Sequence, residues 1–254
     1  MLKGLLAFWK SLPRRSKLIA VLIVGAAALL LVVVMGYVGL QLYSQTRSNS
    51  PAAIGDWFRD RSNRPGLMTF RDQCPDAPFI LPSDGFIGLL WGDPAGPYNI
   101  YRRHTGIDIF GDGAVDEVPV YAVYDGYLTR LDDWRATVII RHNDPLVSGR
   151  QIWSYYTHLA SEDGTESFIE SAFPPGTQEK FVQQGTLLGY QGNYAGSAAS
   201  PVGIHVHMSL VTSEESGAFK NEGVLSNTLD PSPYFGMPLN IDTLPERPIQ
   251  CEKP

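Results

Sequence analysis

The longest apolar run of this chain lies near its N-terminus and constrains most strongly what the chain can fold into. Leu18–Leu40 is a stretch of 23 consecutive residues without a charge. At ~1.5 Å per residue, a helix of that length is about 35 Å long, enough to cross the hydrocarbon core of a bilayer. The run therefore predicts one transmembrane helix, which we place at residues 18–43.

The residues before this run indicate its orientation. Residues 1–17 carry five Lys or Arg and no acidic residue, and basic flanks tend to stay on the cytoplasmic side of a membrane. We therefore expect a basic cytoplasmic segment at 1–17 and a single-pass topology, with everything after Tyr43 outside the cytoplasm.

Two other interpretations of the apolar run are a cleaved signal peptide and a buried core helix. A signal peptide has a shorter apolar region of ~7–15 residues and a small-x-small cleavage site. The segment LQLYSQTRSNS, which follows the run, offers no such site. Charge-free helices this long are also rare in soluble cores, so an uncleaved anchor is the favoured interpretation.

The charge balance beyond the basic segment excludes one class of partner. Residues 18–254 hold 15 Lys or Arg and 26 Asp or Glu, a net charge of −11 with histidine neutral. Because phosphate binding needs a basic surface, we expect no nucleic-acid partner. A cationic or zwitterionic polymer stays compatible with this charge.

The chain has two cysteines, Cys74 and Cys251. Outside the cytoplasm they could form one disulfide that ties the two ends of the main domain together, and free buried thiols are the alternative. Their spacing does not resemble a zinc knuckle.

The pattern beyond residue 78 predicts an all-β domain with minor helix, built as an antiparallel sandwich or barrel. Short runs rich in β-branched and aromatic residues alternate there with turn residues. Eight such runs lie at 79–82, 85–92, 105–111, 118–131, 136–144, 151–159, 185–192 and 203–212.

The remaining segments surround this domain, which we place at 79–215. Residues 44–78 form a proline-interrupted connector outside the membrane, with one short helix expected at 54–60. A second short helix is expected near 166–172. Residues 216–254 form a proline-rich tail that packs on the domain.

Two of the five histidines stand one residue apart, His205 and His207 in GIHVHMSL. Side chains at i and i+2 of a strand face the same side, so these two point together. Taken alone, they are most simply a surface pair on a half-buried strand. A metal site requires partners from elsewhere in the chain.

His104 and Asp108, the first and last residues of HTGID, are candidate partners. Gly106 permits a bend that would bring both side chains around one ion. Taken alone, however, this short motif is more simply explained by a hydrogen-bonded surface pair. His142 and His158 each stand at the end of a predicted strand, where a histidine is commonly structural, and NDPLVSGR between the strands suggests a hairpin.

Zinc chemistry connects these residues. A catalytic zinc typically has three protein ligands from His, Asp or Glu and one open position. His104, Asp108 and one histidine of the pair supply that set. The other histidine of the pair and His158 are then available for proton transfer, for which imidazole suits neutral pH. The sequence contains no HExxH motif, which excludes a match to the thermolysin-like arrangement.

Six motifs follow one another in the chain: HTGIDI, VPVYAVYDGYLT, VIIRH, YYTHL, QQGTLLGYQGN and GIHVHMSL. Their order resembles that of the lysostaphin-type (LytM-like) zinc endopeptidases, and the resemblance covers about residues 79–210. It implies a β-rich core of the duplicated hybrid motif type. The substrates it implies are cross-bridge or stem peptides of bacterial peptidoglycan.

The resemblance also implies a role for each candidate residue. One Zn²⁺ per chain would be bound by His104, Asp108 and His207, and a zinc-bound water would attack the peptide bond. His158 and His205 would flank that water and the developing oxyanion as the catalytic pair. The expected location is the bacterial inner membrane, with the catalytic domain in the periplasm.

Three segments depart from the family pattern: FGDGAVDEVPV after HTGIDI, GIHVH in place of the common GPHLH, and DDWRAT ahead of VIIRH. All five proposed site residues are retained, so the departures bear on substrate preference.

The alternative function is a non-enzymatic or latent module that binds the cell wall or regulates a partner hydrolase, and a regulatory protein partner fits either function. In the latent form, part of the connector would cover the groove.

Overall fold

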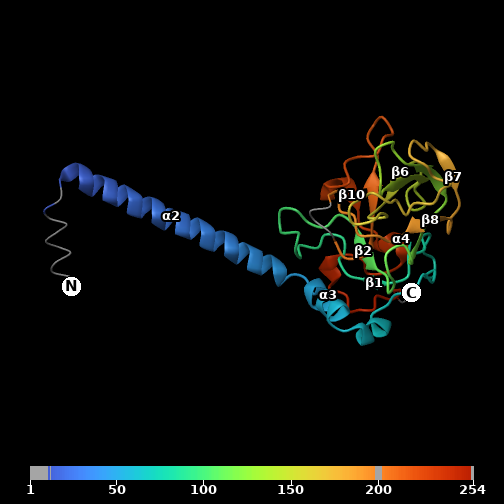
Figure 1. Cartoon of the computed structure of the whole chain (residues 1–254), viewed down its shortest axis with the longest axis horizontal. Helices are drawn as coiled ribbons and strands as arrows, with labels where there is room; N and C mark the ends of the chain where they lie inside the picture. Colours follow the sequence, from blue (N-terminus) through green and yellow to red (C-terminus); the bar gives the residue numbers. More distant parts are fainter. Residues whose placement is uncertain (1–10, 12, 198–201, 253–254) are drawn as a thin grey trace. The chain divides into compact units, whose positions relative to one another are not determined.

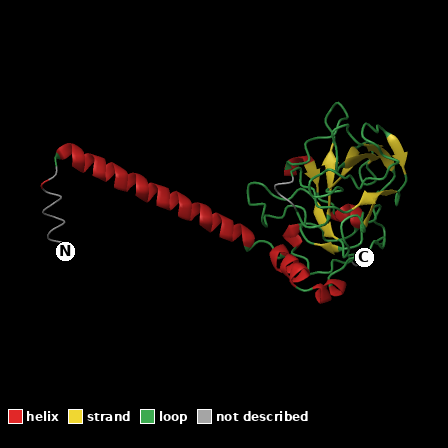
Figure 2. Cartoon of the chain, viewed as in Figure 1, coloured by secondary structure: helices red, strands yellow, loops and turns green. Residues whose placement is uncertain are grey.

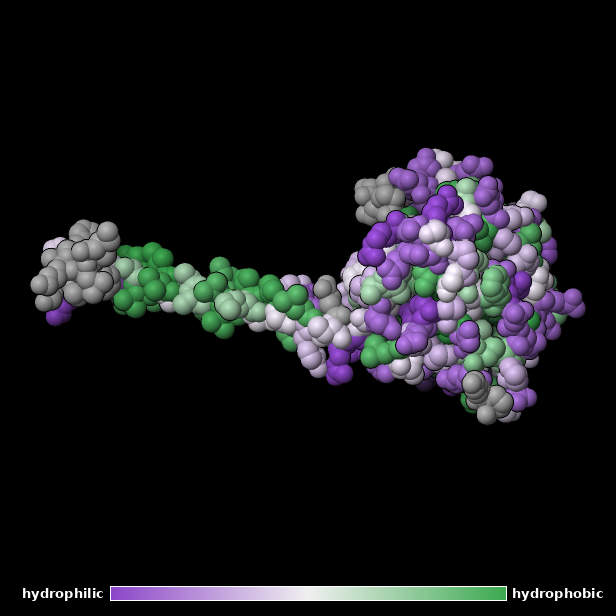
Figure 3. Space-filling model, turned by 90° about the horizontal axis from the view of Figure 1, so that it is seen from below, coloured by the Kyte–Doolittle hydropathy of each residue, from purple (hydrophilic) through white to green (hydrophobic). Residues whose placement is uncertain are grey.

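The apolar run forms one continuous helix, α2 (Arg14–Gln45). The computed structural model describes residue 11 and residues 13–197 and 202–252, so most of the predicted cytoplasmic segment lies outside the described residues. Every residue from Val21 to Leu40 is exposed, and the helix surface is apolar along most of its length (Figure 3). Its length and composition fit a membrane span or a signal sequence. Anchoring therefore stays a prediction.

The chain divides into two compact units, Met1–Ser44 and Gln45–Pro254. The second unit is built on antiparallel β-structure with few helices, which confirms the predicted fold class (Figures 1 and 2). Its larger sheet has the strand order β1-β2-β9-β6-β5-β4-β7, with β10 paired to β9, and a smaller sheet pairs β3 with β8.

The strands of the larger sheet are β1 (Phe86–Ile87), β2 (Ile107–Phe110), β4 (Gly126–Thr129), β5 (Val138–Asn143), β6 (Gln151–Thr157), β7 (Lys180–Val182), β9 (Val206–Thr212) and β10 (Thr228–Leu229). The smaller sheet consists of β3 (Pro119–Tyr121) and β8 (Leu187–Tyr190). Short helices are α3 (Ser50–Arg59), η1 (Arg61–Gly66), η2 (Leu225–Asn227), α4 (Ser232–Phe235) and η3 (Ile241–Thr243).

One face of the larger sheet packs on the main core, and the opposite face carries polar side chains beside a smaller apolar cluster of Ile139, Trp153 and Val211. On β9, Val206, Met208 and Leu210 lie in the main core, whereas His207 and Ser209 alternate with them. Alternation of side chains along a strand places those two on the opposite face. The neighbouring strands follow the same rule, because Ile107 and Ile109 of β2 join the core.

Several local predictions were wrong. Residues 79–82 form no strand, because the backbone N–H of Phe79 donates to Tyr234 O at 2.9 Å, outside any ladder. Only Phe86–Ile87 of the run 85–92 is a strand. The segment 166–172 is not helical, since Ser167 and Ile169 form isolated β-bridges. The strand β7 was missed because its run of three residues is too short to show alternation.

The connector packs on the domain through aromatic side chains. The helix predicted at 54–60 is present but begins earlier, at Ser50, where Pro51 occupies its first turn. The Trp57 ring is buried and stacks on Phe86 with a centroid distance of 5.2 Å. Phe58 meets Phe110 edge to face at 5.6 Å. Through these contacts α3 packs directly against β1 and β2.

The connector is also joined to the C-terminal tail. Cys74 and Cys251 form a disulfide, which answers the question that the sequence left open. In the tail, the Arg247 guanidinium donates to the carbonyl oxygens of Ile87 and Gly88 at 2.6 and 2.9 Å. The connector and the C-terminal tail therefore both pack against the segment Phe86–Gly88 of the domain.

Loss of the disulfide should destabilise the domain without preventing it from folding. The bond joins residues 177 apart in sequence, and closing so long a loop restricts the unfolded chain strongly. We expect the double variant C74S/C251S to lose about 2–4 kcal/mol of unfolding free energy. Denaturant unfolding checks this, with the reduced wild-type chain as the matched control. An unchanged midpoint in both samples would contradict it.

Candidate metal centre

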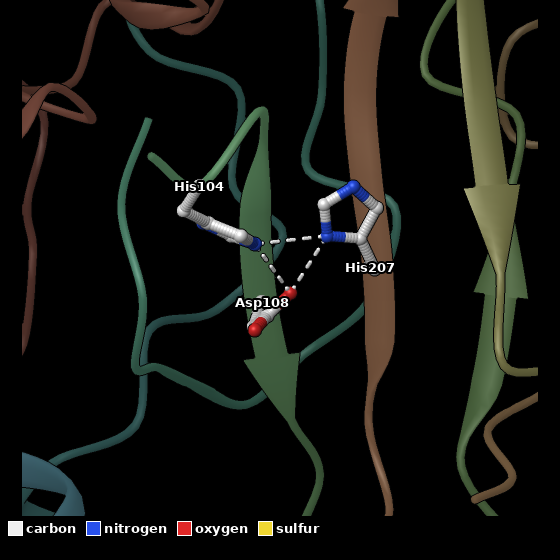
Figure 4. Close-up of side chains that lie close together, drawn as sticks. All are labelled: His104, Asp108 and His207. Atoms are coloured by element: carbon white, nitrogen blue, oxygen red, sulfur yellow. Dashed lines mark hydrogen bonds and ion pairs between the residues drawn. The ribbon is translucent and has the colours of Figure 1, made fainter. Parts of the chain in front are cut away.

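Three buried side chains converge on one point between β2 and β9. His104 Nε2 lies 3.0 Å from Asp108 Oδ1 and 2.9 Å from His207 Nδ1, and the Asp108 and His207 atoms are 2.9 Å apart. Figure 4 shows the three groups pointing toward one another. This cluster contains all three residues that the sequence proposed as zinc ligands.

Strand pairing positions two of these residues. Asp108 on β2 stands directly opposite His207 on β9 in the antiparallel register. His104 precedes β2 and reaches the same point because the chain passes close to β9 at Gly106. A Cβ atom on Gly106 would lie 2.1 Å from the carbonyl oxygen of Met208, so the approach requires a residue without a side chain.

The outer nitrogens of His104 and His207 face hydrogen-bond acceptors. His104 Nδ1 donates to the carbonyl oxygen of Leu90 at 3.0 Å. His207 Nε2 donates to Glu222 Oε1 at 2.9 Å. A neutral imidazole has one protonated nitrogen, so a ring that is neutral and protonated at this outer nitrogen offers the lone pair of its other nitrogen to the cluster.

The charges at the cluster call for a cation. Burial raises the pKa of Asp108, but the neighbouring His104 and His205 hold it well below its usual range, so this carboxylate is ionised. Burial lowers the pKa of His207, yet the Glu222 carboxylate and then Asp108 raise it to about 10. Two lone pairs and a carboxylate oxygen within 3.0 Å of one another need a proton or a metal ion between them.

Two nitrogens and one carboxylate oxygen fit zinc in chemistry and in spacing. Zinc binds such ligands at ~2.0–2.2 Å, and the three atoms lie close enough together to share one ion. Burial of all three limits competition from water. The residues present therefore fit a Zn²⁺ ion with one open position.

His158 and His205 lie side by side next to these three side chains, with ring centroids 4.4 Å apart. His205 Nε2 is 3.7 Å from Asp108 Oδ1. The Nδ1 atoms of the two rings donate to the backbone oxygens of Tyr194 and Gly203, both at 2.6 Å. Each neutral ring therefore carries its lone pair on Nε2.

Burial also keeps both of these histidines neutral. It lowers the pKa of His158 to about 3, and the neighbouring His205 adds to the effect. It lowers the pKa of His205 as well, against the opposing charge of Asp108. His158 has a φ angle of 74°, in the left-handed region. A residue held there costs of order 1–3 kcal/mol, and such strain is concentrated at functional sites.

Glu222 was missed by the sequence analysis. Its carboxylate accepts from His207, and burial raises its pKa while the His207 ring lowers it to about 2. It comes from the segment assigned to the C-terminal tail, which has no motif around KNEG. A single acidic residue 15 positions beyond its partner gives no sequence signal.

A groove of about 550 Å³ reaches His158 and lies on the face of the sheet opposite the main core. Its walls include Trp134, Tyr155, Thr157 and Tyr194. All of its described lining residues lie between positions 133 and 196, so the connector contributes none of them.

Comparison with known proteins gives matches among solved structures. No family model and no curated protein matches the sequence. The chain is similar to a structure named glycyl-glycine endopeptidase lytM from Ruminococcus gnavus, with 20% identity over 51% of this chain and a TM-score of 0.33. It is also similar to lysostaphin, with 20% identity over 59% of this chain and a TM-score of 0.37. The matches span 44% and 49% of those two chains, less than half of each.

A third similar structure is a mutant catalytic domain of the prophage-encoded M23 protein EnpA from Enterococcus faecalis. Identity is 21%, the TM-score is 0.33, and the match covers 63% of this chain and 97% of that one.

Metal analysis of the full chain in detergent should find about one zinc ion per chain. D108A and H207A should lose it, because each removes one of the three converging atoms. H158A should keep it, since that ring is not among them. Retention of zinc by D108A and H207A would contradict this ligand set.

His142 lies in the hairpin of β5 and β6, where it has a structural role. Its Nδ1 donates to Asp125 O, and the Ser154 hydroxyl donates to its Nε2, both at 2.7 Å. Burial lowers the pKa of His142 to about 4. This agrees with the structural interpretation given to its position at the end of a strand.

This lowered pKa predicts a loss of stability in acid. Between pH 6.5 and 4 the unfolded chain takes up a proton at His142 that the folded chain refuses. The contribution of His142 to the free energy of unfolding should therefore fall by about 3 kcal/mol as pH falls through that range. An NMR titration of the His142 ring and unfolding curves at each pH check this. A ring pKa near 6.5 in the folded protein would contradict it.

Proposed function

We propose that this chain is a membrane-anchored zinc metalloendopeptidase that hydrolyses peptide bonds in the cross-bridges or stem peptides of bacterial peptidoglycan. The observation that carries the proposal is the convergence of His104 Nε2, Asp108 Oδ1 and His207 Nδ1 beside two further oriented imidazoles. Three ligands with one open position are typical of catalytic zinc sites.

When bound, zinc would polarise the substrate carbonyl and lower the pKa of the attacking water. His205 and His158 would then transfer protons during the reaction. Each holds its ring by a bond from Nδ1 to a backbone oxygen and has Nε2 available to accept a proton and return it to the leaving amine. Once protonated, the same Nε2–H groups can donate to the oxyanion that develops on the carbonyl oxygen.

The substrate class rests on the motif order in the sequence, which resembles that of the lysostaphin-type endopeptidases. The groove that begins at His158 supports it, because an extended peptide needs an open path to the reacting groups. Aromatic walls formed by Trp134 and Tyr155 would hold such a peptide against the face of the sheet opposite the main core.

The location rests on α2 and on the disulfide. A helix of this length and composition suits a single membrane span. The Cys74–Cys251 bond fits an oxidising compartment such as the periplasm. We therefore place residues beyond the helix on the outer side of the bacterial inner membrane.

Purified full chain should release peptide fragments from cross-linked peptidoglycan, and each cut should create one new amino group. Chelation should abolish release and added zinc should restore it. H158A and H205A should bind zinc normally but lose about 10²–10⁴-fold in rate, as expected for removal of a proton-transfer group. Mass spectrometry of products from defined muropeptides measures the rate and identifies the bond.

The matched control is E215A, which removes an exposed carboxylate outside the site. A zinc-loaded wild type that releases no fragment from any defined muropeptide would contradict the proposal. Full cellular function in an H207A strain would favour a non-enzymatic module instead.

A further inference from the structure

We propose that Glu222 is a positioning residue of the metal centre: its carboxylate fixes the orientation of His207 so that Nδ1 faces the ion. The inference rests on the proposed zinc site but concerns a residue outside the ligand set. The imidazole of His207 is held between two carboxylates. Nε2 is 2.9 Å from Glu222 Oε1, and Nδ1 is 2.9 Å from Asp108 Oδ1.

Glu222 is itself held in place by neighbours of the ligands. The same oxygen, Oε1, accepts from Thr105 Oγ1 at 2.5 Å and from Ser209 Oγ at 3.1 Å. Thr105 follows the ligand His104, and Ser209 stands two residues after the ligand His207, on the same face of β9. One carboxylate oxygen thus joins both chain segments that supply the ligands.

The backbone around Glu222 is fixed by a tight turn. The Gly223 N–H donates to Asn221 Oδ1 at 2.9 Å, and the side-chain amide of Asn227 donates to Asn221 O at 2.9 Å. Although the turn is on the surface, the Glu222 side chain is only 20% exposed. The carboxylate therefore points inward from a turn that restricts its movement.

An imidazole without this partner would lose its orientation. A neutral ring can carry its proton on either nitrogen, and only the form protonated at Nε2 offers a lone pair at Nδ1 to a metal. A carboxylate on Nε2 selects that form and raises the basicity of the ligand. Removing such a partner from a metal-bound histidine typically costs 10–100-fold in metal affinity.

Zinc affinity of the full chain in detergent, measured by competition with a chromophoric chelator, tests the proposal without any activity assay. E222A should bind zinc about 10–100-fold more weakly than wild type. E222D keeps the charge but is too short to reach Nε2, so it should resemble E222A. E222Q keeps the length and an acceptor oxygen, so it should recover most of the affinity. E215A removes an exposed carboxylate from the preceding loop and should bind as wild type.

A second readout follows the hydrogen bond itself. The chain has five histidines, so ¹⁵N-histidine labelling gives a simple NMR spectrum. In the zinc-loaded wild type, the His207 Nε2–H should be protected from exchange, and in E222A that protection should be lost. Thermal unfolding of each metal-free variant shows whether the fold is intact.

Several outcomes would overturn the proposal. One is equal zinc affinity in wild type, E222A and E222D. Another is an E222Q variant that folds normally yet binds more weakly than E222D, because charge and not orientation would then matter. A wild type that takes up no zinc would remove the proposal together with the metal centre. A wild type that binds zinc but cuts no peptide would remove only the proposed hydrolase function.

Discussion

The pairing of β2 with β9 is the interaction on which the rest of the site depends. It sets Asp108 opposite His207 and turns both away from the main core. A slip of one residue in this register would move every side chain of one strand to the other face. The register is fixed from the core side, where Ile107 and Ile109 interdigitate with Met208 and Val206. Burial of apolar residues therefore determines where the polar ones meet.

The close approach at Gly106 brings a third side chain, His104, to this pair. It lets the segment before β2 pass against the backbone of β9, so that His104 enters the cluster from the loop. Around the cluster, each histidine has its outer nitrogen bound to an acceptor on a different segment. Ring orientation is thus set by hydrogen bonds to Leu90, Glu222, Tyr194 and Gly203, none of which belongs to the proposed ligand or catalytic set.

The sequence predicted more about the central strands than about the periphery. Long runs rich in β-branched and aromatic residues, such as 151–159 and 203–212, contain strands, and the motifs that hold His104, Asp108 and His207 gave candidates that the fold does bring together. The strands β7 and β10 escaped because runs of two or three residues carry no recognisable pattern. Glu222 escaped for another reason: its role depends on a turn that returns to β9 after the strand has ended, and no local pattern encodes that return.

The disulfide has a topological consequence for the whole site. Cys74 precedes His104 and Cys251 follows Glu222, so every residue of the cluster lies on a covalently closed ring of chain. A single proteolytic cut anywhere on this ring opens it without releasing a fragment. Both new ends stay attached through Cys74 to the connector, so a nicked domain remains covalently joined to α2.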